Sequence, residues 1–144
     1  MKKLTLLLIG ILFNGIAMAT ELQNVTPEQL LEMQQNQNAL IVDIRTVAEW
    51  QASGIISNSY KLQSFDKEGK FDHEKWLTDL EKLKSSPAQP VILVCRSGHR
   101  SAKVGAFLTE QLGMENVYHL ENGLKAWIES GHAVSPNCLK VACK

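Results

Sequence analysis

The stretch Val91–Ser101, with the sequence VILVCRSGHRS, decides how the rest of this 144-residue chain is interpreted. Four apolar residues with a strong preference for strands precede Cys95, which predicts a buried strand ending at the cysteine. A short loop containing Gly98 follows, and a helix is predicted to begin at His99. In such an arrangement, backbone N–H groups of the loop and of the helix N-terminus converge on the sulfur. We therefore expect Cys95 to be a reactive thiolate facing an anion-binding site.

Strand-like and helix-like segments alternate on both sides of this stretch. Strands are predicted at 39–44, 59–62, 91–95 and 117–120, and helices at 26–35, 46–51, 71–83, 99–112 and 123–129. The alternation predicts an α/β fold, a three-layer sandwich with a parallel central sheet and helices on both faces. Ligands of such folds bind at the carboxyl ends of the strands, where Cys95, Asp43 and Arg45 all lie.

Local signals support individual elements of this fold. Thr26 and Gln29 form a capping box at the start of the first helix, with Pro27 at its first position. An apolar stripe marks the buried side of the helix 99–112, with its residues spaced four apart: Val104, Leu108 and Leu112. Three large aromatic residues are expected in the core: Trp50, Trp76 and Trp127.

The first 19 residues have the features of a secretory signal peptide. Lys2 and Lys3 precede an apolar run that reaches Ile16, and residues 17–19, Ala-Met-Ala, form a small-x-small cleavage site. The alternative is an uncleaved membrane anchor, but the run is shorter than the roughly 20 apolar residues that a spanning helix needs. We therefore expect a periplasmic or secreted protein with no stable membrane insertion after cleavage.

Cleavage would leave residues 20–144, enough for one compact domain. We place this domain at 20–136 and a C-terminal tail at 137–144. The two lysines of the signal segment belong to the 15 basic residues, so 13 remain against 15 acidic ones. No nucleic-acid partner is expected, because such partners require a basic surface.

Three sequence blocks together resemble the rhodanese domain, a sulfurtransferase module. Residues 42–50, VDIRTVAEW, followed by Gly54, are similar to the family's D-x-R-x-x-x-E-[FYW] and G-H-I elements. Residues 95–101, CRSGHRS, are similar to its C-R-S-G-x-R-S loop. Residues 122–127, NGLKAW, with Gly131, are similar to its G-G-x-x-x-W-x-x-x-G ending. The blocks occur in order, and the resemblance covers residues 25–134.

Two positions depart from the family pattern. Ile55 stands where the family usually has histidine, and Asn122 replaces the first glycine of the last block. Both positions are expected to be structural, so the departures should shift loop geometry without removing the chemistry.

The resemblance implies chemistry through a persulfide of Cys95. The thiolate would take the outer sulfur of a small anionic donor such as thiosulfate and pass it to cyanide or to a thiol, including a protein thiol. Loop amides would hold the sulfur and arginines the sulfonate, with substrate contacts from Arg96, Ser97, Gly98, His99, Arg100 and Ser101. A supporting polar network is expected from Asp43, Arg45 and Glu49. Glu49 is also a candidate partner for Arg100, and no cofactor is expected.

The three cysteines of the chain leave two arrangements open. Export to an oxidising compartment favours a disulfide between Cys138 and Cys143, with Cys95 free. Alternatively, one of the tail cysteines resolves an oxidised or persulfidated Cys95. A metal site at Cys95 and His99 is not expected, because no Cys-x2-Cys pair or third ligand lies nearby. The other histidines lie elsewhere in the sequence: His73, His119 and His132.

Other functions are weighed against sulfur transfer. Four residues separate Cys95 from Arg100, whereas cysteine phosphatases have five, and no general acid for phosphate transfer is identifiable. A second alternative is a non-catalytic sulfur-carrier or binding module. A third is a thiol redox protein that uses Cys95 with Cys138 or Cys143.

Overall fold

The computed structural model describes residues 20–135 of the chain. The predicted signal peptide at 1–19 and the predicted Cys138–Cys143 disulfide lie outside the described residues, so both stay predictions. In the described part, no helix is both long enough and apolar enough to cross a membrane.

Between residues 20 and 135, five parallel strands form one sheet with the order β1-β5-β4-β2-β3. The strands are β1 (Gln23–Val25), β2 (Leu40–Asp43), β3 (Tyr60–Lys61), β4 (Val91–Val94) and β5 (Val117–Leu120). The helices are α1 (Pro27–Asn36), α2 (Val47–Ser53), α3 (His73–Leu83), α4 (His99–Ala106) and α5 (Gly123–Glu129), and a π-helical turn, η1 (Phe107–Gln111), continues α4.

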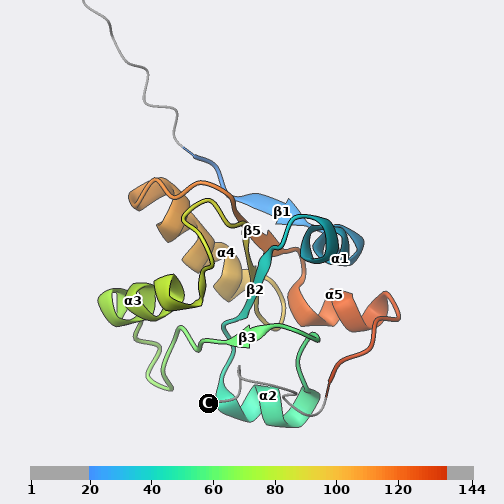
Figure 1. Cartoon of the computed structure of the whole chain (residues 1–144). Helices are drawn as coiled ribbons and strands as arrows, with labels where there is room; N and C mark the ends of the chain where they lie inside the picture. Colours follow the sequence, from blue (N-terminus) through green and yellow to red (C-terminus); the bar gives the residue numbers. More distant parts are fainter. Residues whose placement is uncertain (1–19, 136–144) are drawn as a thin grey trace, which may run out of the picture.

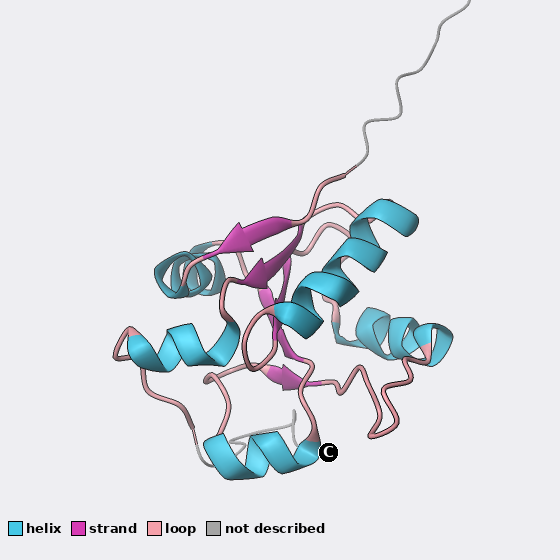
Figure 2. Ribbon diagram, turned by 180° about the vertical axis from the view of Figure 1, so that it is seen from behind, coloured by secondary structure: helices cyan, strands magenta, loops and turns pink. Residues whose placement is uncertain are grey.

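The helices make the fold a three-layer sandwich. Helices α1 and α5 cover one face of the sheet, and α3 and α4 cover the other (Figure 1). Helix α2 follows β2 directly and lies apart from both layers, as the view from behind also shows (Figure 2). The predicted α/β fold with helices on both faces is confirmed.

Alternation along β4 determines which layer each side chain joins. Ile92 and Val94 pack in the cluster with α1 and α5, whereas Leu93 and Cys95 pack in the cluster with α3 and α4. Successive side chains of a strand point to opposite faces, so this division follows from the period of two. Cys95 is therefore delivered to the face on which α4 begins four residues later.

One strand was not predicted from the sequence. β1 has only three residues, and only Val25 among them is buried. It pairs with β5 at the edge of the sheet, with Asn24 opposite His119. A three-residue segment with one buried side chain gives no periodicity to detect.

The predicted apolar stripe on the helix 99–112 is wrong at its last residue. Val104 and Leu108 are buried, but Leu112 is 46% exposed. The helix widens into the π-helical turn η1, in which the Leu112 N–H group donates to Phe107 O, five residues back. The wider turn changes the angular spacing of the side chains, and it carries Leu112 away from the core.

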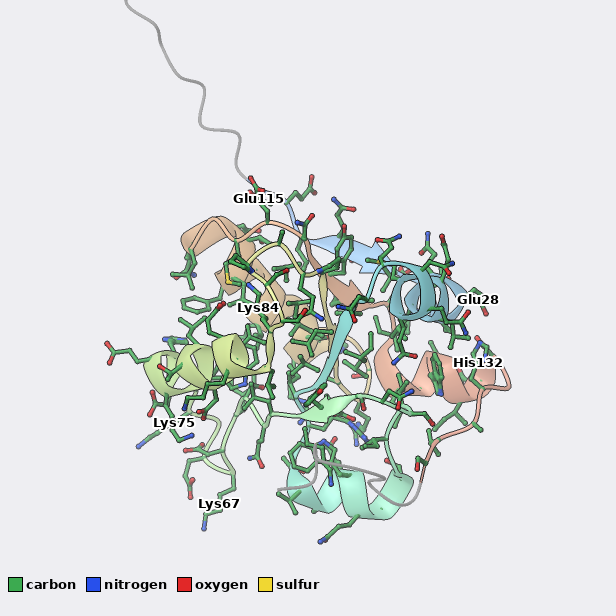
Figure 3. All side chains as sticks on the ribbon, viewed as in Figure 1. Glu28, Lys67, Lys75, Lys84, Glu115 and His132 are labelled. Atoms are coloured by element: carbon green, nitrogen blue, oxygen red, sulfur yellow. The ribbon has the colours of Figure 1, made fainter. Side chains whose placement is uncertain are left out.

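The aromatic expectations are met at two positions of three. Trp76 and Trp127 are buried, whereas Trp50 is only half-buried on α2 and donates its indole N–H to Asp43 Oδ1 at 3.0 Å. The surface around the core carries charged side chains, and Glu28 of α1 faces His132, which follows α5 (Figure 3).

Truncating a core leucine tests the packing of α3 on the sheet. Leu80 is fully buried, so Leu80→Ala should lower the free energy of unfolding by about 2–5 kcal/mol, because it removes apolar contacts and leaves a cavity. Leu112→Ala is the matched control, and this exposed site should change the value by less than about 0.5 kcal/mol. Urea unfolding measures both, and equal losses would contradict the assignment of the core.

Candidate active site

The sulfur of Cys95 occupies the position of a helix cap. Gly98 is the N-cap residue of α4 and has no side chain to accept an N–H group of the first turn. Cys95 Sγ accepts the N–H of Ser101 at 3.4 Å, the amide that an N-cap side chain usually binds, and that of Gly98 at 3.1 Å. The cysteine is only 1% exposed, so these donors act on a largely desolvated sulfur. Two backbone dipoles thus favour negative charge on Sγ.

The N-terminus of α5 holds the same loop from its other side. The carbonyl oxygen of Cys95 accepts the N–H of Leu124 at 2.8 Å, and that of Arg96 accepts the N–H of Lys125 at 3.1 Å. Gly123 makes this approach possible, because a Cβ there would collide with the Cys95 carbonyl. With its carbonyls bound to α5, the loop presents its amides to the sulfur.

Asn122 keeps the backbone that the family's glycine would favour. Its φ of 57° is left-handed, a region that asparagine tolerates better than most side chains. The substitution is therefore compatible with the turn into α5. Ile55, the other departure, is buried and pairs with Ser135 through two backbone hydrogen bonds.

A bidentate ion pair fastens α2 to the loop. Arg100 Nη1 donates to Glu49 Oε2 at 2.9 Å, and Nη2 donates to Glu49 Oε1 at 2.6 Å. Glu49 also accepts the N–H and the hydroxyl of Thr46, so that the same carboxylate completes the N-terminal cap of α2. The pairing raised from the sequence is confirmed. Because both terminal nitrogens of Arg100 bind Glu49, its first role here is to hold the loop in place.

Asp43 and Arg45 form a buried ion pair, and each side chain is 1% exposed. The Arg45 guanidinium contacts both carboxylate oxygens, and its Nη2 also donates to the carbonyl of Gly54 at 2.7 Å. Trp50 donates to the same carboxylate. The pair therefore ties the end of β2 to α2 and to the turn that follows it. Of the three residues expected to support the cysteine loop, only Glu49 contacts it, through Arg100.

The remaining loop residues differ in exposure. Arg96 and His99 are exposed, and Ser97 Oγ lies 3.3 Å from His99 Nδ1. These three side chains are available to a molecule that approaches the loop. Within residues 20–135, no group of His, Cys, Asp and Glu is arranged to hold a metal ion.

One buried histidine of the site was missed. His119 Nδ1 lies 3.2 Å from Ser101 Oγ, which in turn lies 3.4 Å from Cys95 Sγ. Its Nε2 lies 2.7 Å from Asn24 Oδ1 on the unpredicted strand β1. Alternation along β5 was the available signal, because His119 shares the face of Val117, which packs with α4 and Cys95.

The Glu49–Arg100 pair makes stability depend on pH. Partial burial raises the pKa of Glu49, but hydrogen bonds from Arg100 and Thr46 and the charge of Arg100 outweigh it, so the pKa falls from 4.5 to about 2. A carboxyl with a lowered folded-state pKa stabilises the fold above its unfolded pKa, and this stability is lost as the pH falls from about 4.5 toward about 2.

Glu49→Gln should therefore unfold more readily than the wild type at neutral pH, and the difference should shrink on acidification through that window. The measurement is urea unfolding at a series of pH values. Glu68→Gln, which removes an exposed carboxylate 3.7 Å from Lys67, should follow the wild-type profile. A Glu49→Gln curve parallel to that of the wild type would contradict the prediction.

Comparison with known proteins gives a consistent picture. The model of the rhodanese-like domain family matches residues 26–130. The thiosulfate sulfurtransferase GlpE of Glaesserella parasuis is 32% identical over 112 residues, which cover 74% of this chain and 86% of that protein. GlpE of Pseudoalteromonas translucida is 30% identical over 110 residues, covering 73% and 88%.

Solved structures share the fold at lower identity. A rhodanese-related protein from Thermoplasma volcanium has a TM-score of 0.58 and 22% identity, covering 80% of this chain and 99% of that one. The polysulfide-sulfur transferase homodimer of Wolinella succinogenes has a TM-score of 0.59 and 24% identity, covering 77% and 76%. With the family model spanning most of the chain and the cysteine loop built as described, this chain belongs to the rhodanese-like domain family.

Proposed function

We propose that this protein is a sulfurtransferase that moves a sulfane sulfur from thiosulfate, or a similar anionic donor, to a thiol or cyanide through a persulfide on Cys95. One observation carries the proposal: Cys95 Sγ accepts two backbone N–H groups at the start of α4. Such donors stabilise an anionic sulfur without offering a competing nucleophile. Relatives named thiosulfate sulfurtransferase support the same class of activity.

In the first half-reaction, the Cys95 thiolate attacks the outer sulfur of thiosulfate. The bond between the two sulfurs of the donor breaks, its electron pair leaves with sulfite, and a Cys95–S–S⁻ persulfide forms. The three negative charges of the reactants are conserved, and no external oxidant is required. The exposed side chains of Arg96 and His99, together with the partly buried Ser97, would bind the sulfite portion of the donor.

In the second half-reaction, an acceptor thiolate or cyanide attacks the outer sulfur of the persulfide. The new persulfide or thiocyanate departs, and Cys95 is released as a thiolate. An enzyme that alternates between the Cys95 thiolate and the Cys95 persulfide follows ping-pong kinetics. A protein thiol would serve as acceptor if it could reach the loop.

Mass spectrometry of the intact protein tests the role of Cys95. Incubation with thiosulfate should add one sulfur atom to the wild type, and cyanide should remove it and yield thiocyanate. Cys95→Ser should gain no sulfur and should turn over at the uncatalysed rate, because it lacks the nucleophile. Sulfur addition or turnover that persists in Cys95→Ser would overturn the proposal.

The double variant Cys138→Ser/Cys143→Ser is the matched control for this experiment. It keeps the described site intact and should acquire and transfer sulfur like the wild type. Loss of turnover in this variant would instead favour a redox cycle between Cys95 and a tail cysteine.

We also propose that residues 1–19 direct export and are removed. The support is the basic start, the apolar run and the Ala-Met-Ala site. After expression in a Gram-negative bacterium, the periplasmic fraction should contain a chain that begins at Thr20, as read by intact mass. Ala19→Arg should accumulate the uncleaved chain, because the cleavage site requires a small residue. A full-length wild-type chain in the cytoplasm would contradict the proposal.

A further inference from the structure

A line of four polar side chains runs from the reactive sulfur to the edge of the sheet. Cys95 Sγ lies 3.4 Å from Ser101 Oγ, which lies 3.2 Å from His119 Nδ1, and His119 Nε2 lies 2.7 Å from Asn24 Oδ1. Cys95, Ser101 and His119 are buried, whereas Asn24 is exposed at the edge. The three side chains beyond the cysteine come from three different elements, namely α4, β5 and β1, so the packing of these elements determines the distances along the line.

Counting hydrogens shows that this chain can exist in two states. When Asn24 Oδ1 accepts a hydrogen from His119 Nε2, the Nδ1 atom of a neutral ring is an acceptor. Ser101 has a single hydroxyl hydrogen, which it can donate to the Gly98 carbonyl at 3.0 Å or turn toward the sulfur or the ring. If the hydroxyl donates to Nδ1, its oxygen can accept from a thiol. If the ring is protonated and donates to Ser101, the hydroxyl can donate to a thiolate.

We propose that His119 takes up the proton of the Cys95 thiol through Ser101, so that the resting thiol becomes the thiolate that attacks the donor. The S–H bond breaks as its proton moves to Ser101 Oγ, while the hydroxyl proton moves to His119 Nδ1. The products are a thiolate and an imidazolium whose Nε2–H donates to Asn24. The step is a proton transfer with no change of oxidation state, and the same path returns the proton when the acceptor removes the outer sulfur. The inference rests on the proposed function, because it supplies that function's nucleophile.

The surroundings of His119 suit a ring that is neutral at rest. Burial lowers the pKa of His119, and the charge of Glu121 opposes this effect. His119 also lines a cavity of about 520 Å³ with the titratable side chains of Glu21, His99, Glu110 and Glu121. The cavity lets solvent exchange protons with the ring, and the negative charge of Glu121 favours the imidazolium once it forms.

The direction in which Asn24→Asp moves the alkylation midpoint of Cys95 distinguishes this relay from a direct charge effect on the sulfur. Asn24→Asp places a carboxylate at His119 Nε2 and favours the imidazolium, so the relay should increase the thiolate fraction. The pH of half-maximal Cys95 alkylation by iodoacetamide should then fall by on the order of one pH unit. A carboxylate that acts only through space disfavours the thiolate and should move the midpoint upward. The Cys138→Ser/Cys143→Ser variant is used, so that Cys95 is the one thiol left to react.

Three control variants test whether the shift of the alkylation midpoint passes through Ser101 and His119. Gln23→Glu adds the same charge on the same strand without a bond to His119, and should produce only the small upward shift. In a Ser101→Ala background, Asn24→Asp should no longer move the midpoint downward, because the relay is broken. His119→Gln, which can form hydrogen bonds but cannot take up a proton, should raise the midpoint. Thermal unfolding of each variant verifies that it is folded.

A second substitution tests the same sign without altering the hydrogen-bonded chain. Glu121→Gln removes a charge that raises the pKa of His119, so the relay predicts an upward shift of the alkylation midpoint. Without a relay, loss of the Glu121 charge would act on the thiolate only through space and would move the alkylation midpoint downward. Three outcomes would overturn the relay. The alkylation midpoint could fall in Glu121→Gln, or it could rise or stay unchanged in Asn24→Asp. It could also still fall when Asn24→Asp is made in the Ser101→Ala background. Alkylation requires no sulfur donor, so these outcomes are independent of whether a persulfide forms.

Discussion

The site depends on one hydrogen-bond acceptor at the N-terminus of α4, where a cysteine sulfur takes the place of the usual N-cap side chain. Every helix begins with N–H groups that lack an intrahelical acceptor, and α1, α2 and α3 satisfy one of them with Thr26, Thr46 and Asp72. At α4 the cap residue is Gly98, and the acceptor is the sulfur of Cys95. The requirement that would otherwise be met by a small polar side chain therefore places a cysteine against backbone donors. Helix α5 completes the arrangement by binding the loop carbonyls.

Much of the fold and the reactive centre could be read from sequence because the signals were local. The apolar run 91–94, the following cysteine and Gly98 lie within a few residues of one another, and each has a well-defined conformational meaning. The capping box at Thr26 is similarly local, and the structure contains it. The pairing of Glu49 with Arg100 spans 51 residues, and it became a candidate only because both lay in blocks resembling one family.

The features that sequence reasoning missed depend on tertiary pairing. β1 is a strand because β5 offers it an edge, and His119 belongs to the site because β5 and α4 meet beside Cys95. The π-helical turn that exposes Leu112 is likewise invisible to a pattern with a fixed period. Trp50 is only half-buried because α2 lies apart from both helical layers, and hydrophobicity alone does not encode where a helix is placed.

The backbone origin of the donors has a consequence for how such a domain can diversify. Amide groups are the same whatever side chains the loop carries, so the two N–H donors to the sulfur do not depend on the identity of the side chains at Arg96, Ser97 and His99. Those positions are free to change in charge and size without disturbing the N–H groups on the sulfur. The fold thus separates the backbone donors on the sulfur from the exposed side chains around them, and substitution of those side chains can change what approaches the loop while the donors to the sulfur stay in place.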